Sequence, residues 1–287
     1  MKKSQLSLLS LIILLSALSL CISFHINNGK RSVQITNSQL NDASPSFCMS
    51  AGGGELLRTA LRVSSVEKSV SFYTSCLGMK VISDDSDKKC ARLGYDGDVS
   101  IDLVEDSTIA KLQLGDAFLG FGISRVDASS VLSSVQREGG KVVTDISDFA
   151  YAASQIPDED EMKTTPVRYG RINDPDGYTI EVHEGNSNGF MKSILKVLDL
   201  EESIEYYERV GCKLLRKRSN VMGVPKEASL CAYVGGESEN EPYIELVYPY
   251  ATSKLDMGNG LIEVTIRGNS KEGDVKVDPN GYSVQQN

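Results

Sequence analysis

The sequence predicts an α+β fold made of two copies of one module, in which a strand and a helix are followed by several more strands. Three observations predict it. A strand-and-helix segment occurs twice, alternating strand patterns follow each copy, and each half of the chain ends in the same kind of hairpin turn. Repeated units of this kind form antiparallel-rich sheets with helices on their outer face.

The first repeated segment contains a strand, a helix and a second strand. LRTALRVSSVEKSVSFYTSCLGMKVI at 57–82 matches MKSILKVLDLEESIEYYERVGCKLL at 191–215. Internal repeats are read before other patterns, because missing one leads to the wrong fold. In this match Arg58 is aligned with Lys192, so one strand face carries a long cation at the same place in both copies.

Both helices carry start and stop signals. Ser65 and Asp199 are suitable N-cap residues. Gly78 and Gly211 follow the helices, where a residue with positive φ is expected. The apolar residues of the first helix recur at helical spacing, namely Val66, Val70, Tyr73 and Leu77.

Strands and hairpin turns follow each copy. DVSIDLVE at 98–105 and EPYIELVY at 241–248 alternate as strands do. NDPDGYTIEV at 173–182 and VDPNGYSVQQ at 277–286 contain Asp-Gly and Asn-Gly, which are strong hairpin signals. Each of these pairs therefore predicts equivalent strands in the two halves.

The last unit of the chain is shorter than its counterpart. A helix is predicted between Asp127 and Glu138, inside the unit at 118–184, whereas no helical pattern fits in 261–287. Three explanations remain open: the fold tolerates an uncovered patch of sheet, a partner covers that patch, or the sequence is an imperfect gene model.

Composition and charge exclude some classes of partner. The chain has 30 Lys and Arg against 39 Asp and Glu, and it has no basic stripe, so nucleic acid and anionic membranes are not expected partners. The six cysteines form no CxxC pair and no metal-ligand spacing. We interpret those outside the leader as free thiols in a reducing compartment.

The N-terminal residues have the composition of a targeting leader. A positive start and an uncharged apolar run predict a signal peptide at 1–23, with an uncleaved anchor as the alternative. Residues 24–50 are rich in Ser and Asn and resemble a transit peptide. Together they resemble the bipartite leader of proteins sent to secondary plastids. We expect a plastid location, with the secretory pathway as the alternative, and no stable membrane association after leader removal.

These repeated motifs, together with REGGKV at 137–142 and DPDGYTIEVHE at 174–184, resemble glyoxalase I (lactoylglutathione lyase) of the vicinal oxygen chelate (VOC) superfamily. The similarity is to the fused, two-module form. It implies modules at 55–185 and 189–287, each a pair of βαβββ units, with the second module truncated. It also implies a monomer in which the two modules pair within one chain.

The resemblance implies a metal-assisted isomerisation. In that family a divalent ion, zinc or nickel, polarises the hemithioacetal of methylglyoxal and glutathione, and a carboxylate moves a proton between adjacent carbons. Glutathione is the implied co-substrate. Two sites are implied, each with two ligand positions from either module. The ligand positions of site A fall on Arg58, Asp102, Glu263 and Gln285. The ligand positions of site B fall on Lys192, Glu245, Gly120 and Glu181.

Neither site retains the ligand set that the resemblance implies. The Arg58 guanidinium has no lone pair for a metal, and Lys192 would have to lose its proton beside two carboxylates. Gly120 has no side chain, and Gln285 cannot act as a base. We therefore expect no bound metal, with zinc or nickel only if the family site functions. We also expect an ion pair in each cleft, because a cation there keeps the carboxylates charged.

The resemblance implies roles for five residues. In site B, Glu181 would be the base, Glu245 its partner and Lys192 an unusual electrophile. Arg62 corresponds to the family arginine that binds a glutathione carboxylate, and Lys196 is its counterpart in the second copy. The alternative for both residues is a solvated charge at the rim.

Two further features have structural and functional interpretations. His183, the one histidine outside the leader, lies on the same strand face as Glu181, and we interpret it as a core or surface residue rather than a metal ligand. The acidic segment IPDEDEM at 156–162 is interpreted as a solvated loop, with a lid over the cleft as the alternative.

Two functions are therefore carried forward. The first is a glyoxalase I-like enzyme with degraded metal sites. The alternative is a non-catalytic VOC protein that binds a small molecule or acts as a scaffold. A ring-opening dioxygenase ranks lower, because its iron site needs two histidines and a carboxylate.

Overall fold

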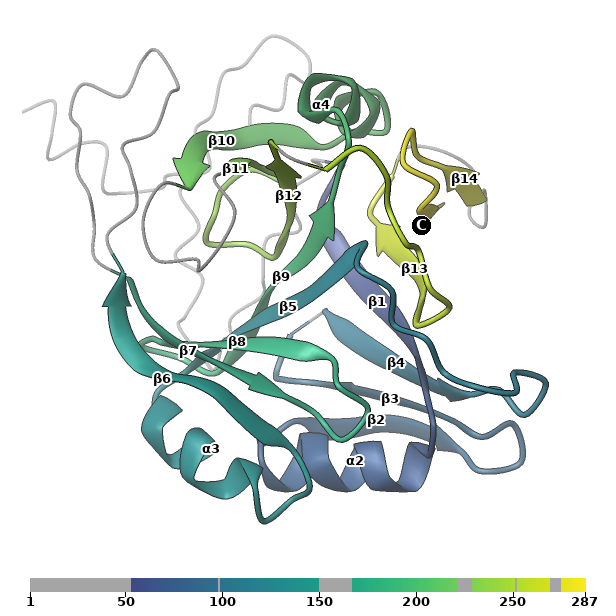
Figure 1. Cartoon of the computed structure of the whole chain (residues 1–287), viewed down its shortest axis with the longest axis vertical. Helices are drawn as coiled ribbons and strands as arrows, with labels where there is room; N and C mark the ends of the chain where they lie inside the picture. Colours follow the sequence, from purple (N-terminus) through teal and green to yellow (C-terminus); the bar gives the residue numbers. More distant parts are fainter. Residues whose placement is uncertain (1–52, 98, 150–166, 221–228, 251, 269–274) are drawn as a thin grey trace, which may run out of the picture. The chain divides into compact units, whose positions relative to one another are not determined.

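The computed structural model describes residues 53–97, 99–149, 167–220, 229–250, 252–268 and 275–287 (Figure 1). All of them belong to one compact unit. The predicted signal peptide, the transit-like segment and the acidic segment at 156–162 lie outside the described residues. No helix in the described part of the chain is long and apolar enough to cross a membrane.

The elements follow the repeated order that the sequence predicts. The helices are α2 (Val66–Ser75), α3 (Ala128–Val135) and α4 (Leu200–Arg209). The strands of the first half are β1 (Leu56–Val63), β2 (Lys80–Asp85), β3 (Cys90–Gly94), β4 (Ser100–Glu105), β5 (Phe118–Arg125), β6 (Lys141–Phe149), β7 (Val167–Asn173) and β8 (Thr179–Glu184). Those of the second half are β9 (Gly189–Lys196), β10 (Lys213–Asn220), β11 (Ser229–Gly235), β12 (Tyr243–Pro249), β13 (Leu261–Ile266), β14 (Val275–Val277) and β15 (Ser283–Gln286).

The predicted helix caps of α2 and α4 are confirmed. The Ser65 hydroxyl accepts a hydrogen bond from the amide of Lys68, and the Asp199 carboxylate accepts one from the amide of Glu202. Each bond satisfies an amide that the first turn leaves without a partner. Gly78 and Gly211 have φ of +69° and +107°, so the chain reverses after each helix as predicted. Local sequence therefore sets where these two helices begin and where the chain turns away.

The third helix also forms where it was predicted. Asp127 occupies the N-cap of α3 but makes no side-chain cap bond. Its carboxylate accepts hydrogen bonds of 2.9 and 2.7 Å from the Arg125 guanidinium instead. A polar cap residue is thus drawn into an ion pair with the preceding strand.

Two sheets each combine strands from both halves of the chain. The seven-stranded sheet has the order β14-β15-β13-β1-β4-β3-β2, and the eight-stranded sheet has the order β10-β11-β12-β9-β5-β8-β7-β6. Antiparallel pairing of β1 with β13 and of β5 with β9 joins the halves. Helix α2 packs on β2–β4, α3 on β6–β8 and α4 on β10–β12 (Figure 1). The predicted α+β fold is confirmed.

The shortened last unit is covered by the chain itself. The described residues contain no helix between β13 and β14, and β13 is followed by two strands where β5 is followed by three. Even so, Val264, Ile266 and Val284 are fully buried, and Tyr282 is 1% exposed. The core of this unit is therefore closed without the missing elements, although Val277 at its edge is 64% exposed.

Candidate functional site

Site A gathers its four predicted residues around the guanidinium of Arg58. The side chain extends from β1, and its Nη2 lies 3.3 Å from Glu263 Oε1 and 2.6 Å from Gln285 Oε1. Its Nε lies 3.5 Å from Asp102 Oδ2 on β4. These residues come from β1 and β4 of the first half and from β13 and β15 of the second. The pairing of β1 with β13 is what brings them together.

Site B gathers two carboxylates around the ammonium group of Lys192. The Lys192 Nζ lies 2.5 Å from Glu245 Oε2 and 2.9 Å from Glu181 Oε2. Lys192 is 2% exposed, and both glutamates are 5% exposed. Removing such a cation alone would take away the charge that the two buried carboxylates share. Three of the four residues predicted for site B therefore meet.

The fourth position of site B is filled by backbone. Gly120 has φ of +122°, and a Cβ there would lie 2.0 Å from the carbonyl oxygen of Thr179. Gly122, which faces Lys192 across β5 and β9, is also needed, because a Cβ there would lie 2.9 Å from Lys192 Cε and Cγ. Gly122 thus lets the lysine stem pass into the site, and Gly120 allows the close approach of the Thr179 backbone. The role of Gly122 was not anticipated from the sequence.

A second layer of arginines, also missed from the sequence, surrounds the carboxylates. Arg171 lies directly opposite Glu181 in the β7–β8 pairing, and its Nε and Nη2 donate to Glu181 Oε1 at 3.1 and 2.9 Å. Arg92 lies directly opposite Asp102 and binds it through two hydrogen bonds of 2.7 and 2.9 Å. Arg218 approaches Glu245 Oε1 at 3.5 Å. The available signal was cross-strand register, because arginines placed opposite acids on neighbouring strands pair with them.

His183 belongs to site B through Glu181. Its Nε2 lies 3.2 Å from Glu181 Oε2, and its ring stacks on Tyr169 with centroids 4.9 Å apart. Burial lowers the pKa of the imidazole, so the ring is neutral near pH 7. Nδ1 has no hydrogen-bond partner in the described part of the chain, which assigns the proton to Nε2. His183 therefore holds the carboxylate in place as a neutral donor.

The charges around Glu181 keep it ionised. Burial alone would raise the pKa of its carboxyl group, but the Lys192 ammonium, the His183 hydrogen bond and the Arg171 guanidinium outweigh burial and lower the pKa well below its usual range. The pKa of Arg171 is raised: burial opposes its charge, and the charge of Glu181 more than compensates. Glu181 and Arg171 are thus a fixed ion pair at neutral pH.

The residues present do not fit the divalent ion that the family resemblance implies. The Lys192 nitrogen already lies within hydrogen-bond distance of both carboxylates, where it donates protons and offers no lone pair. In site A the Arg58 guanidinium fills the corresponding position and stays protonated. No group of three or more His, Cys, Asp or Glu side chains suited to a metal occurs among the described residues.

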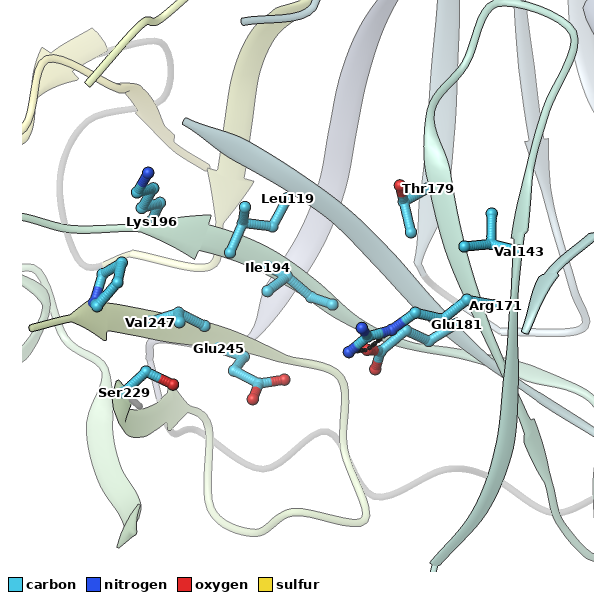
Figure 2. Close-up of a pocket in the computed structure, with 11 residues that line it drawn as sticks. Leu119, Val143, Arg171, Thr179, Glu181, Ile194, Lys196, Ser229, Glu245 and Val247 are labelled. Carbon is cyan, nitrogen blue, oxygen red and sulfur yellow. Dashed lines mark hydrogen bonds and ion pairs between the residues drawn. The ribbon is translucent and has the colours of Figure 1, made fainter. Parts of the chain in front are cut away.

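A cavity of about 340 Å³ adjoins site B (Figure 2). Its lining combines an apolar wall with charged groups at two places, and comprises Leu119, Val143, Arg171, Thr179, Glu181, Ile194, Lys196, Ser229, Glu245, Val247 and Pro249. Figure 2 shows the ends of Arg171, Glu181 and Glu245 converging on one part of the cavity, while Lys196 lies apart from them. The cavity can therefore hold a small molecule against both carboxylates.

The two predicted substrate-binding cations lie in different cavities. Lys196 lines the cavity of site B, with its Nζ 3.0 Å from Asp116 Oδ2. Arg62 lines a separate cavity of about 360 Å³, where its Nε lies 3.4 Å from Asp106 and its Nη1 donates to the carbonyl of Asn259. Of the two, Lys196 alone lines the same cavity as Glu181 and Glu245.

Comparisons with known proteins agree with this architecture. The family model described as the glyoxalase/bleomycin resistance protein/dioxygenase superfamily matches residues 55–182. A probable chloroplastic lactoylglutathione lyase from Arabidopsis thaliana is 31% identical over 222 residues, which are 74% of this chain and 59% of that relative. This chain thus spans less than two thirds of its length. The lactoylglutathione lyase of Escherichia coli O157:H7 is 30% identical over 141 residues, which are 47% of this chain and 95% of that relative.

Solved structures extend the similarity over both halves. Glyoxalase I from Zea mays has a TM-score of 0.65 and 25% sequence identity, covering 81% of this chain and 91% of its own. The fold of both halves thus has a counterpart in a glyoxalase I structure. The chain belongs to the glyoxalase/bleomycin resistance protein/dioxygenase (VOC) superfamily, as a glyoxalase I-like member.

Proposed function

We propose that this protein isomerises a hemithioacetal of glutathione in site B, without a bound metal. The names of the relatives support the substrate class, since they are lactoylglutathione lyases. The observation that carries the proposal is the ammonium of Lys192, held between two carboxylates that face a cavity. Because the residues do not fit a metal ion, the fixed cation beside a potential base would take the place of the metal in stabilising the negative charge that develops on the substrate.

The reaction would move one proton between neighbouring carbons. Glu245 is the better placed acceptor, because three donors already engage Glu181. Glu245 would take the proton from the carbon that bears sulfur and hydroxyl, giving an enediolate, and return it to the adjacent carbon. The hydroxyl proton of the first carbon would pass to the oxygen of the second, which gives an α-hydroxy thioester. Lys192 and Arg171 would stabilise the negative oxygen that develops. Lys196, apart from this cluster, would bind a carboxylate of glutathione.

The test is turnover of methylglyoxal with glutathione, followed by thioester absorbance, with chelator and with added zinc or nickel. We expect activity that chelator does not remove. Replacing the base, Glu245→Gln, should reduce kcat by about a hundredfold or more, since a general base contributes roughly 10²–10⁴. Glu237→Gln is the matched control, because Glu237 is an exposed glutamate that pairs with Lys213.

Two results would contradict this proposal. Activity that chelator abolishes and metal restores would show that a metal binds despite Lys192. No turnover under any condition, with a folded protein, would favour the non-catalytic alternative in which the cavity only binds a small molecule.

We further propose that residues 1–50 direct the protein to a plastid. The charged start, apolar run and transit-like segment support this location, and so does the chloroplastic designation of the Arabidopsis relative. A fluorescent protein fused to these residues should reach the plastid in an organism with secondary plastids. Retention in the endoplasmic reticulum, or secretion, would contradict the proposal.

A further inference from the structure

Arg171 presents hydrogen-bond donors to the cavity of site B. Its Nε and Nη2 bind Glu181, and Nη2 also lies 3.4 Å from the Tyr169 hydroxyl. Nη1 makes no hydrogen bond to any described residue, although the side chain lines the cavity and is 24% exposed. A guanidinium held rigidly on one edge, with its other nitrogen facing a cavity, is a ready recognition point for a carboxylate.

Glu245 supplies a hydrogen-bond acceptor in the same cavity. Its Oε2 binds Lys192 at 2.5 Å, whereas Oε1 has only the longer contact of 3.5 Å with Arg218 in the described part of the chain. Figure 2 shows the carboxylate directed toward the ends of Arg171 and Glu181. An ionised carboxylate is an acceptor only, so the group that it would hold in a ligand is a hydroxyl or another donor.

The charge of the cluster favours an anionic ligand. Among the described residues it combines three cations, Lys192, Arg171 and Arg218, with two carboxylates, Glu181 and Glu245. Four of these five side chains are at most 7% exposed. An anion bound at Arg171 would be attracted by the neighbouring cations, and the low local dielectric makes this attraction stronger than it would be in water.

The rest of the cavity is apolar. Leu119, Val143, Ile194, Val247 and Pro249 form most of the remaining wall. A hydrocarbon chain bound there leaves water at about 25 cal/mol per Å² of apolar surface. The cavity therefore places one anion-binding group, one acceptor and an apolar wall within reach of a single small molecule.

We propose that site B binds a small α-hydroxy carboxylate with an apolar chain. Its carboxylate accepts hydrogen bonds from Arg171 Nη1, its hydroxyl donates to Glu245, and its chain lies along Leu119, Ile194 and Val247. This ligand occupies the cavity of the proposed reaction, yet the inference concerns binding alone and does not depend on turnover.

Isothermal titration calorimetry of the full-length protein with three probes tests the proposal. α-Hydroxyhexanoate should bind most tightly. Hexanoate lacks the hydroxyl. Hexane-1,2-diol keeps the hydroxyl and has a neutral hydroxymethyl group in place of the carboxylate. We expect each to bind at least about tenfold more weakly, since one hydrogen bond to a charged group contributes about 1.5–3 kcal/mol.

Variants assign each contact. Arg171→Gln should weaken binding of both acids about tenfold or more and leave the diol unchanged, whereas Arg137→Gln, at an exposed arginine, should change nothing. Glu245→Gln should weaken the two probes that carry the hydroxyl, the hydroxy acid and the diol, bringing the hydroxy acid toward the affinity of hexanoate, and should leave hexanoate unchanged. Leu119→Trp, which fills the cavity and leaves every charge in place, should abolish binding of all three probes.

Several outcomes would overturn the inference. These are equal affinity for the acid and the diol, undiminished affinity of a folded Arg171→Gln variant, binding that survives Leu119→Trp, or no heat with either acid at millimolar concentration. Binding without turnover would contradict the proposed reaction but support the ligand. Turnover without such binding would do the reverse.

Discussion

At the residue scale, one buried lysine pairs with both carboxylates of site B. Lys192 is nearly inaccessible to solvent, and its stem passes beside the backbone of Gly122 to reach two carboxylates. Arg58 has the equivalent position in site A, but its side chain is 19% exposed and its partners are about 20% exposed. Losing one partner of an ion pair costs more free energy when the pair is buried than when it is partly exposed. The loss of Lys192 from site B should therefore cost more than the loss of Arg58 from site A.

Replacing this lysine by a neutral side chain of similar length, Lys192→Met, should strongly destabilise the fold. Both buried carboxylates would lose the ammonium between them, and the free energy of unfolding should fall by up to about 3–5 kcal/mol, the upper end being limited because Arg171 and Arg218 remain as partners. Urea unfolding at neutral pH measures this change in the free energy of unfolding. Lys80→Met is the matched control, because the Lys80–Asp96 pair is 67% and 86% exposed and should contribute nothing measurable. A change of less than about 1 kcal/mol at Lys192 would contradict the assignment.

The same comparison has a defined pH dependence. Because the folded-state pKa of Glu181 is lowered, its stabilising contribution is present above the unfolded pKa, about 4.3, and is lost as pH falls through the folded value. Without Lys192 the carboxylates take up protons more readily in the folded state. The stability gap between the wild type and Lys192→Met should therefore narrow on acidification below about pH 4, and a constant gap would contradict this account.

At the element scale, the two Asp-Pro turns are built alike. In the β7–β8 turn the Asp174 carboxylate accepts hydrogen bonds from the amides of Asp176 and Tyr178 and from the hydroxyl of Tyr73 on α2. Burial, as the largest influence, raises the pKa of Asp174 to about 7. The carboxylate thus ties a hairpin to a helix in the first module.

The equivalent carboxylate in the second module, Asp278, accepts hydrogen bonds from the amides of Asn280 and Tyr282 and lies 3.5 Å from the Tyr207 hydroxyl on α4. The repeated hairpin motif thus determines a tertiary contact as well as a turn. In both modules it joins the two C-terminal strands of a unit to the helix of its neighbouring unit.

What the sequence predicted at this scale depended on local chemistry and on the repeat. Ser65, Asp199 and the glycines after the helices were predictable because capping is decided within a few residues. The acids around Arg58 and Lys192 were predictable from the alignment of the two copies. Gly122 was not, because its role depends on the register of β5 with β9, two strands that are far apart in the sequence. Arg171 was missed although it pairs with Glu181 within one hairpin, because its pairing depends on the exact register of that hairpin.

At the scale of the whole molecule, the two sites have diverged. Site A contains two arginines and two carboxylates, and it takes Glu263 and Gln285 from the shortened last unit. Site B is drier, has three cations for its two carboxylates, and adjoins the cavity that carries both proposals. Site A is therefore best explained as a structural ion cluster between the modules, and it is site B in which the proposed reaction would take place.

This division of roles requires the shortened unit to be an integral part of one cooperative fold. Tyr282, in the turn before β15, places its hydroxyl 2.7 Å from the carbonyl oxygens of both Ala117 and Lys196. Tyr178, its counterpart, donates to the carbonyl of Arg62 at 2.6 Å. Each tyrosine thus fastens a hairpin to the strand that carries a predicted substrate-binding cation.

Tyr282→Phe should lower the free energy of unfolding by about 1–2 kcal/mol, because a buried carbonyl loses a donor without any loss of packing. Urea unfolding followed by circular dichroism should still give one transition with an unchanged slope, since the core of the last unit is continuous with the rest. Tyr250→Phe, at a tyrosine that is 55% exposed, should have no effect. Two separate transitions, or an unchanged midpoint for Tyr282→Phe, would show that the last unit is an appendage, and site A could then not act as a structural link between the modules.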